Sequence, residues 1–83
     1  MKNQYGNQCL KLWTVYFNPT DHPGQFVARR FDGDKPTEEF HTARRIETVR
    51  RWIFKDAKKF GQGTPVNLER APNDDPCIVE TWI

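Results

Sequence analysis

The sequence predicts a small α+β domain, in which a three- to five-stranded antiparallel sheet carries one helix packed on one face. Two observations predict this class. Short runs rich in β-branched and aromatic residues are separated by turns with proline and glycine, which is typical of antiparallel strands. A single segment, residues 42–60, repeats its apolar residues with the period of a helix. The predicted element order is β-β-(β)-α-β-β.

The first strand is predicted over residues 9–17. One of its faces carries Trp13 and Val15, and the other carries Leu12 and Tyr16. Both faces are partly apolar, so we expect either a central strand or an edge strand that another segment covers. The residues before this strand are polar, and we expect a disordered N-terminal arm over residues 1–8 and a single domain over residues 9–83.

A turn with two prolines and a glycine follows the first strand and reverses the chain. Residues 25–31 then return as the second strand, antiparallel to the first, with Arg29 and Arg30 on opposite faces. Another turn covers residues 32–36. A short third strand is predicted over residues 37–41.

The helix is predicted to begin near Thr42, whose hydroxyl suits an N-cap, and to end near Gly61, a residue suited to the position after a helix. Five apolar residues share one face and form the predicted core stripe: Ile46, Val49, Ile53, Ala57 and Phe60. Five cations gather on the opposite side: Arg44, Arg51, Lys55, Lys58 and Lys59.

Two more strands are predicted after the helix, over residues 66–70 and 77–83, with an acidic turn between them. The last strand is apolar to its final residue, so it must be tied into the sheet. One helix covers only one face of a sheet. We therefore expect the other face, lined by Leu10, Leu12, Tyr16 and Trp82, to need a cover, which self-association or a partner would supply.

The ends of the chain resemble those of a group of short uncharacterised bacterial proteins. The matching segments are Trp13 to Arg30, which contains Tyr-Phe-Asn-Pro-Thr-Asp-His-Pro and Phe-Val-Ala-Arg, and Asp74 to Ile83, which reads Asp-Asp-Pro-Cys-Ile-Val-Glu-Thr-Trp-Ile. The resemblance covers about a third of the chain. It implies a cytoplasmic bacterial protein, with a mobile element as one source, and no activity. The helical segment departs from the group because it is longer and more basic.

Catalysis and metal binding find little support in the residues. His22 and His41 lie in different segments, and no metal-ligand spacing, phosphate-binding loop or nucleophile motif occurs. Cys9 and Cys77 are typical of buried thiols in a reducing cytosol. No apolar run is long enough to span a membrane. We therefore expect a cytoplasmic protein that is not an enzyme, with no cofactor, no metal and no small-molecule substrate.

Charge is the strongest functional signal. Residues 42–60 hold seven of the thirteen Lys and Arg and two of the eleven acids, which gives +5 there and −3 over the rest. The cations of the helix form the candidate binding face, with Trp52 and Phe54 beside it and with Arg29 and Arg30 as an extension.

Two kinds of partner fit this candidate face. Our main interpretation is a non-catalytic protein-interaction module, regulatory or inhibitory, whose basic helix face binds an acidic protein. The alternative is nucleic acid, with cations on phosphates and aromatic rings on bases. For Arg29 and Arg30 the sequence favours a structural role, each side chain lying on an aromatic ring and pairing with an acid such as Glu80.

Overall fold

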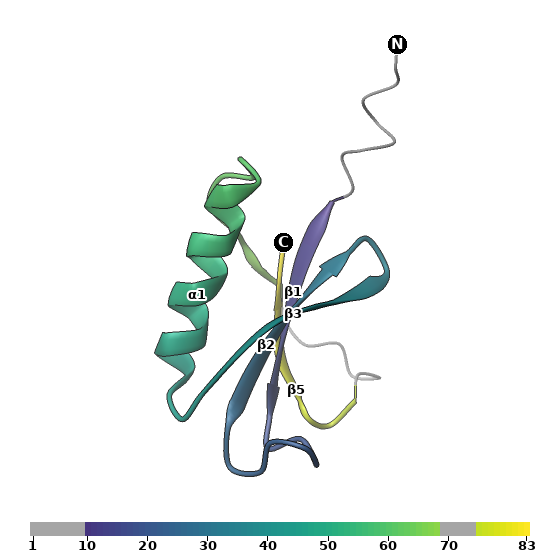
Figure 1. The fold of residues 1–83 in the computed structure, drawn as a ribbon, viewed down its shortest axis with the longest axis vertical. Coiled ribbons are helices and arrows are strands. Elements are labelled where there is room, and N and C mark those ends of the chain that lie inside the picture. The colour runs from purple at the N-terminus through teal and green to yellow at the C-terminus, as the bar shows by residue number, and fades with distance from the viewer. Residues whose placement is uncertain (1–9, 69–74) are drawn as a thin grey trace.

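The computed structural model describes residues 10–68 and 75–83 of the chain. In this part the chain forms one antiparallel sheet with a helix packed on it, which confirms the predicted α+β class (Figure 1). The strands are β1 (Lys11–Phe17), β2 (Phe26–Asp32), β3 (Lys35–Ala43), β4 (Asn67–Leu68) and β5 (Ile78–Trp82), and the helix is α1 (Ile46–Lys59).

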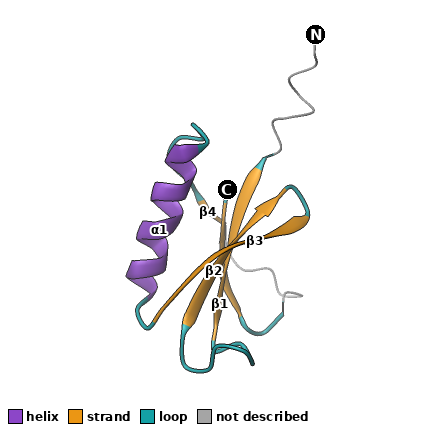
Figure 2. Ribbon diagram, in the orientation of Figure 1, coloured by secondary structure: helices purple, strands orange, loops and turns teal. Residues whose placement is uncertain are grey.

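The sheet has the strand order β3-β2-β1-β5-β4, so β1 is the central strand and β3 and β4 are the edges. The first strand, which is apolar on both faces, is therefore a central strand and not a covered edge strand. Helix α1 follows β3 directly and leads to β4 at the opposite edge, so it crosses one face of the sheet (Figure 2). The other face carries no helix in the described residues.

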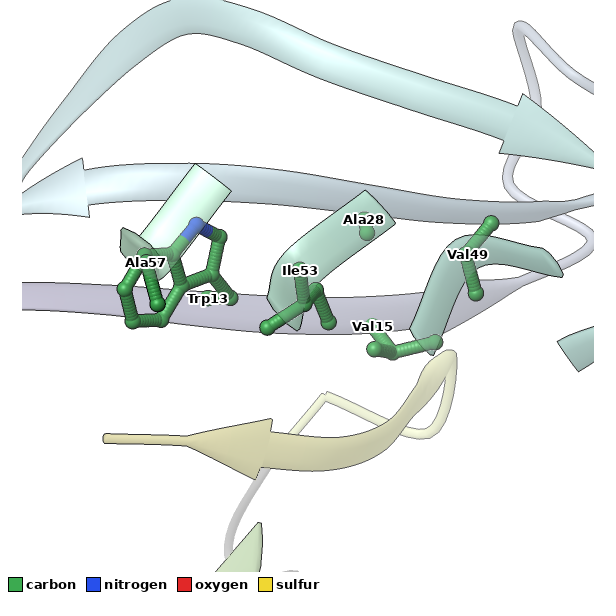
Figure 3. Close-up of a cluster of buried hydrophobic side chains, with 6 residues drawn as sticks. All are labelled: Trp13, Val15, Ala28, Val49, Ile53 and Ala57. Atoms are coloured by element: carbon green, nitrogen blue, oxygen red, sulfur yellow. The ribbon is translucent and has the colours of Figure 1, made fainter. Parts of the chain in front are cut away.

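The core lies between α1 and the three strands on the β3 side. Val15 of β1 stands opposite Ala28 of β2, and the alternation of the strands puts Trp13 on the same face. The helix contributes residues one turn apart, so their side chains line a single stripe. The six buried core residues are Trp13, Val15, Ala28, Val49, Ile53 and Ala57 (Figure 3).

The first helical residue is Ile46, so the helix starts three residues later than the prediction with Thr42 as N-cap. Thr42 and Ala43 instead continue β3, where they pair with Val27 and Phe26 of β2. The N-cap is Arg45, whose side chain makes no capping hydrogen bond. The pairing of β3 with β2 therefore outweighed the capping preference of Thr42, because a threonine is also favourable in a strand.

The end of the helix agrees with the prediction, but the prediction that Phe60 belongs to the core was wrong. Gly61 has a φ of 64°, and its N–H donates to the carbonyl oxygen of Lys58. Phe60 is 44% exposed. Its ring instead supports two cations, with Nζ of Lys11 at 4.7 Å and the guanidinium of Arg30 at 4.6 Å from the ring centre.

Several strand boundaries also differ from the predictions. The third strand is longer than residues 37–41 and includes Pro36, which an edge strand tolerates. Its pairing with β2 is interrupted between Arg29 and Phe31 of β2. The predicted N-terminal arm and the end of the predicted strand over residues 66–70 lie outside the described residues. No helix of the described part is long and apolar enough to pass through a membrane.

The face of the sheet opposite α1 carries Leu12 paired with Phe31 and Tyr16 paired with Val27, as the alternation predicts. Trp82 does not belong to this face. Its indole N–H donates to Glu80 and its ring meets Phe54 of α1 edge-on at 5.4 Å, so it packs beneath the helix. The prediction was wrong because only the pairing of β5 with β1, which sets Trp82 opposite Trp13, decides which face of β5 meets the helix. Self-association through the opposite face stays a prediction.

Candidate functional site

Two sets of cations among the described residues bear on the site, and the first set lies between α1 and the sheet. There Asp56 of α1 is only 2% exposed. The indole N–H of Trp13 donates to Oδ2 of Asp56 over 3.0 Å, and Nη1 of Arg30 donates to both carboxylate oxygens over 3.0 and 3.2 Å. A carboxylate is costly to bury without such donors, so this acid serves the fold.

A second buried acid, Glu80 of β5, has the same kinds of partner. Arg50 of α1 donates to it through Nε over 2.9 Å and through Nη2 over 2.8 Å. The indole N–H of Trp82 donates over 2.7 Å and the side-chain amide of Asn67 over 3.3 Å. Burial raises the pKa of Glu80, but the hydrogen bonds from Arg50 and Trp82 outweigh burial, and the pKa of this carboxyl lies below its usual value.

Two further cations of the strands, Lys11 and Arg29, are also paired or stacked. Lys11 of β1 forms an ion pair with Asp32 over 2.9 Å. On the opposite sheet face, Arg29 donates to the carbonyl oxygen of Thr37 over 2.8 Å and lies over the ring of Phe40 at 5.1 Å. Each of these cations therefore has its electrostatic partner within the sheet.

Arg29 and Arg30 do not extend the basic side of the helix, because they point to opposite faces of the sheet. This corrects the expectation that the pair adds to the helix cations. The structural interpretation of Arg30 fits its contacts better, since its guanidinium lies on Phe60 and pairs with an acid. That acid is Asp56, whereas Glu80, the example that the sequence suggested, pairs with Arg50.

The second set of cations covers the outer side of α1. We call it the basic face, and it consists of Arg51, Lys55, Lys58 and Lys59, all exposed. Among the described residues, a carboxylate comes within 4.0 Å of only one of them, Lys59, whose Nζ is 3.9 Å from Asp56. Arg44, the fifth predicted cation, is exposed in the segment between β3 and α1.

The two predicted flanking aromatics contact other rings. Phe54 meets Trp82 edge-on, on the β5 side of the helix. Trp52 lies on the β3 side, where its ring stacks on His41 with the centres 5.8 Å apart and the planes at 11°. Trp52 is thereby fixed against the edge strand, beside the basic face.

A groove runs between α1 and β3, and we call it the α1–β3 groove. It encloses about 190 Å³ and is lined by His41, Thr48, Arg51, Trp52 and Lys55. Two of the predicted basic residues and one predicted aromatic therefore share a concave site. His41 was not predicted as part of this site. Side chains alternate along a strand, so His41 lies on the same face of β3 as Ala43, which is the face toward α1.

A second hollow, of about 150 Å³, lies on the opposite sheet face near the β1–β2 turn. Its lining includes Tyr16, His22 and Arg29. Burial raises the pKa of Tyr16 above its usual value. The positive charge of Arg29 lowers this pKa by less than burial raises it, and the negative charge of Asp75 raises it further. The Arg29 guanidinium is already held by Thr37 and Phe40. This hollow therefore offers a ligand less charge than the α1–β3 groove does.

Comparisons with family models, with curated proteins and with solved structures found no match to this chain. The resemblance of the chain ends to short bacterial proteins therefore stays a prediction. Within residues 10–68 and 75–83, no three His, Cys, Asp or Glu side chains are grouped as metal ligands would be.

Proposed function

We propose that this protein acts by binding, as a protein-interaction or regulatory module that presents the basic face of α1 to an acidic partner. The observation that carries this proposal is the sorting of the cations. Those between the helix and the sheet are matched by buried acids, whereas those on the outer side of α1 are exposed and almost without acidic neighbours among the described residues. Stability of the fold does not account for the outer set.

The geometry of the basic face supports a protein as the partner. Arg51, Lys55 and Lys58 recur at spacings of three and four residues, so they project from one side of a rigid helix. Exposed charges of one sign accelerate encounter with a surface of the opposite sign and select against wrong partners. A module of this size that covers such a surface on a larger protein would inhibit or regulate it.

The test is to find the partner and then to remove the basic face. Proteins crosslinked to the chain in its native host are identified, and the purified partner is titrated with wild type and with the R51A/K55A/K58A/K59A variant. We expect the variant to bind at least about tenfold more weakly, and wild-type binding to weaken as salt rises. The single variant K35A, at the start of an edge strand, is the control. Equal affinities of wild type and the fourfold variant would overturn the proposal.

Nucleic acid is the second candidate, because the Trp52–His41 stack beside Arg51 and Lys55 places an aromatic surface next to cations. A labelled single strand and a labelled duplex are titrated with the protein at about 50 mM salt, where phosphate contacts are strong. Tight binding that declines steeply with salt would favour this candidate. If neither probe binds at low salt, nucleic acid is excluded.

A further inference from the structure

The edge strand β3 has unused backbone hydrogen-bonding groups beside the α1–β3 groove. Residues 40–43 pair regularly with β2 on one side, and β3 is the last strand of the sheet on the other. In the described residues, no further backbone or side-chain hydrogen bond involves these four residues. Alternate residues of a strand direct their N–H and C=O groups to opposite sides, so half of these groups face outward.

The two halves of β3 differ in their capacity to pair with another strand. Pro36 has no N–H to donate, and the pairing with β2 is irregular near Thr37. The hydroxyl of Thr37 also accepts the N–H of Glu39. The first half of β3 is therefore poorly suited to a new strand. Residues 40–43 are regular, and β3 runs from there directly to the start of α1 (Figure 1).

One wall of the α1–β3 groove is basic and aromatic. His41 faces α1 and stacks on Trp52, while Arg51 and Lys55 stand on the helix side of the groove. A strand that added to β3 would direct every second side chain toward this wall. Acidic side chains at those positions would meet the two cations, and an apolar or aromatic one would meet the Trp52–His41 stack.

We infer that an extended acidic segment of the partner adds to β3 as a further strand and lies in the α1–β3 groove. This inference rests on the proposed function and specifies how the basic face is used. Backbone hydrogen bonds to residues 40–43 supply part of the affinity, and the alternate side chains that face Arg51, Lys55 and Trp52 supply the selectivity. The acids of the segment lie toward the Ala43 end of β3, because Glu38 and Glu39 repel them at the other end.

Charge disfavours a second copy of the chain in the same position. Antiparallel pairing of two β3 strands about residues 40–43 would place the two α1 helices on the same side of a continuous sheet. The exposed cations beside the groove, Arg51 and Lys55, would then approach their own counterparts across the dimer axis. An acidic strand in this position would instead bring negative charges next to these cations and neutralise them.

The probe is a capped heptapeptide of sequence Thr-Phe-Val-Glu-Val-Glu-Thr, which places an aromatic ring and two acids on one side when extended, with both acids in the same half of the peptide. It is titrated into nitrogen-labelled protein and followed by the shifts of the amide signals. We expect residues 40–43 and the helix around Arg51 to respond together, with a dissociation constant of about 0.1–1 mM. The peptide with Lys in place of both Glu should bind at least about tenfold more weakly.

Backbone methylation and a matched pair of variants test the two parts of the inference. Two further peptides are methylated on the odd or on the even backbone nitrogens. Since only one set faces β3, one of them should lose about tenfold or more in affinity and the other should not. The R51A/K55A variant should bind about fivefold more weakly, and K58A/K59A, whose residues do not line the groove, should bind like wild type.

Each alternative outcome overturns the inference in a recognisable way. Shifts confined to α1, with both methylated peptides binding equally, would mean that the helix binds acids without strand addition, and would leave the proposed function standing. No response of residues 40–43 up to about 2 mM peptide would exclude the groove as a site for such a strand. A single-stranded oligonucleotide that shifts the same residues at lower concentration would identify nucleic acid as the occupant. A free protein that sediments as a dimer with residues 40–43 protected would identify a second copy.

Discussion

Replacing Glu80 by glutamine tests whether the buried acids neutralise the cations beneath α1. The substitution keeps the shape of the side chain and removes its charge. Glu80 accepts four hydrogen bonds, two from Arg50, one from Trp82 and one from Asn67. Glutamine has one accepting oxygen instead of two and adds an N–H₂ group that faces the guanidinium donors.

The magnitude follows from these contacts. Two bonds from Arg50 lose the help of the negative charge, at about 1 kcal/mol each. One donor of the guanidinium and one donor of Trp82 or Asn67 also lose their acceptor, at about 1–2 kcal/mol more together. The side chain of Arg50 is 40% exposed, so water recovers part of this loss. We therefore expect E80Q to lower the free energy of unfolding by about 2 kcal/mol at neutral pH. For a domain of this size that corresponds to about 8–16 °C in the melting temperature.

The effect must also depend on pH, with a definite sign. The folded state holds the pKa of Glu80 below its usual value, so the unfolded chain takes up the proton first as the pH falls. The stabilisation by the carboxylate is complete above the unfolded pKa of about 4.3 and is lost as the pH falls through the folded pKa. The difference between wild type and E80Q should stay constant between about pH 7 and pH 5.5 and shrink below about pH 4.

Urea unfolding followed by tryptophan fluorescence measures this difference, since Trp13 and Trp82 both contact the charged pairs. The exposed acid Glu38 of β3, which makes no ion pair with a described residue, provides the control, and E38Q should unfold at the wild-type midpoint. A loss in E80Q below about 0.5 kcal/mol at pH 7 would refute the account of Glu80 as a buried, charge-paired acid. A difference that stayed the same at about pH 3 would refute it as well.

Three further substitutions test the core and the helix end. Trp13→Phe removes the indole donor to Asp56 and some buried volume, and should cost about 2–3 kcal/mol in urea unfolding, with Trp52 and Trp82 as the remaining reporters. Ile53→Ala, at a fully buried position, should cost about 2–5 kcal/mol, and a loss under 1 kcal/mol would contradict its place in the core. Gly61→Ala should cost about 1 kcal/mol in thermal unfolding because its φ of 64° strains any other residue, although no atom would obstruct the added methyl group.

The sequence allowed the class of fold and the two faces of the strands to be predicted, because both depend on local periodicity. Trp13 and Val15 alternate with Leu12 and Tyr16, and the structure keeps this division. The helix start was wrong because Thr42 fits both an N-cap and a strand. Only its pairing with Val27, fifteen residues earlier in the chain, decides between the two.

The exposed cations of the candidate site could be predicted from the sequence, but the α1–β3 groove could not. The exposed positions of Arg51 and Lys55 follow from the helical period alone. The groove does not, because it needs His41 of β3 to stack on Trp52, and a stack between two elements is absent from either segment alone. In the same way, the sequence indicated that Arg30 pairs with an acid but could not identify Asp56 as that acid, twenty-six residues away.

The internal ion pairs also change how the formal charge of residues 42–60 is interpreted. This formal charge of +5 counts Arg50 of the helix, which Glu80 of β5 neutralises, and Asp56, which pairs with Arg30 of β2. The internal pairs therefore remove one cation and one acid of the helix from the surface balance. What remains outside is a row of exposed cations beside an edge strand whose outward hydrogen-bonding groups have no partner in residues 10–68 and 75–83. Because the fold has satisfied its own charges, substitutions in that row should change binding far more than stability, and this difference separates a binding surface from a solvated helix face.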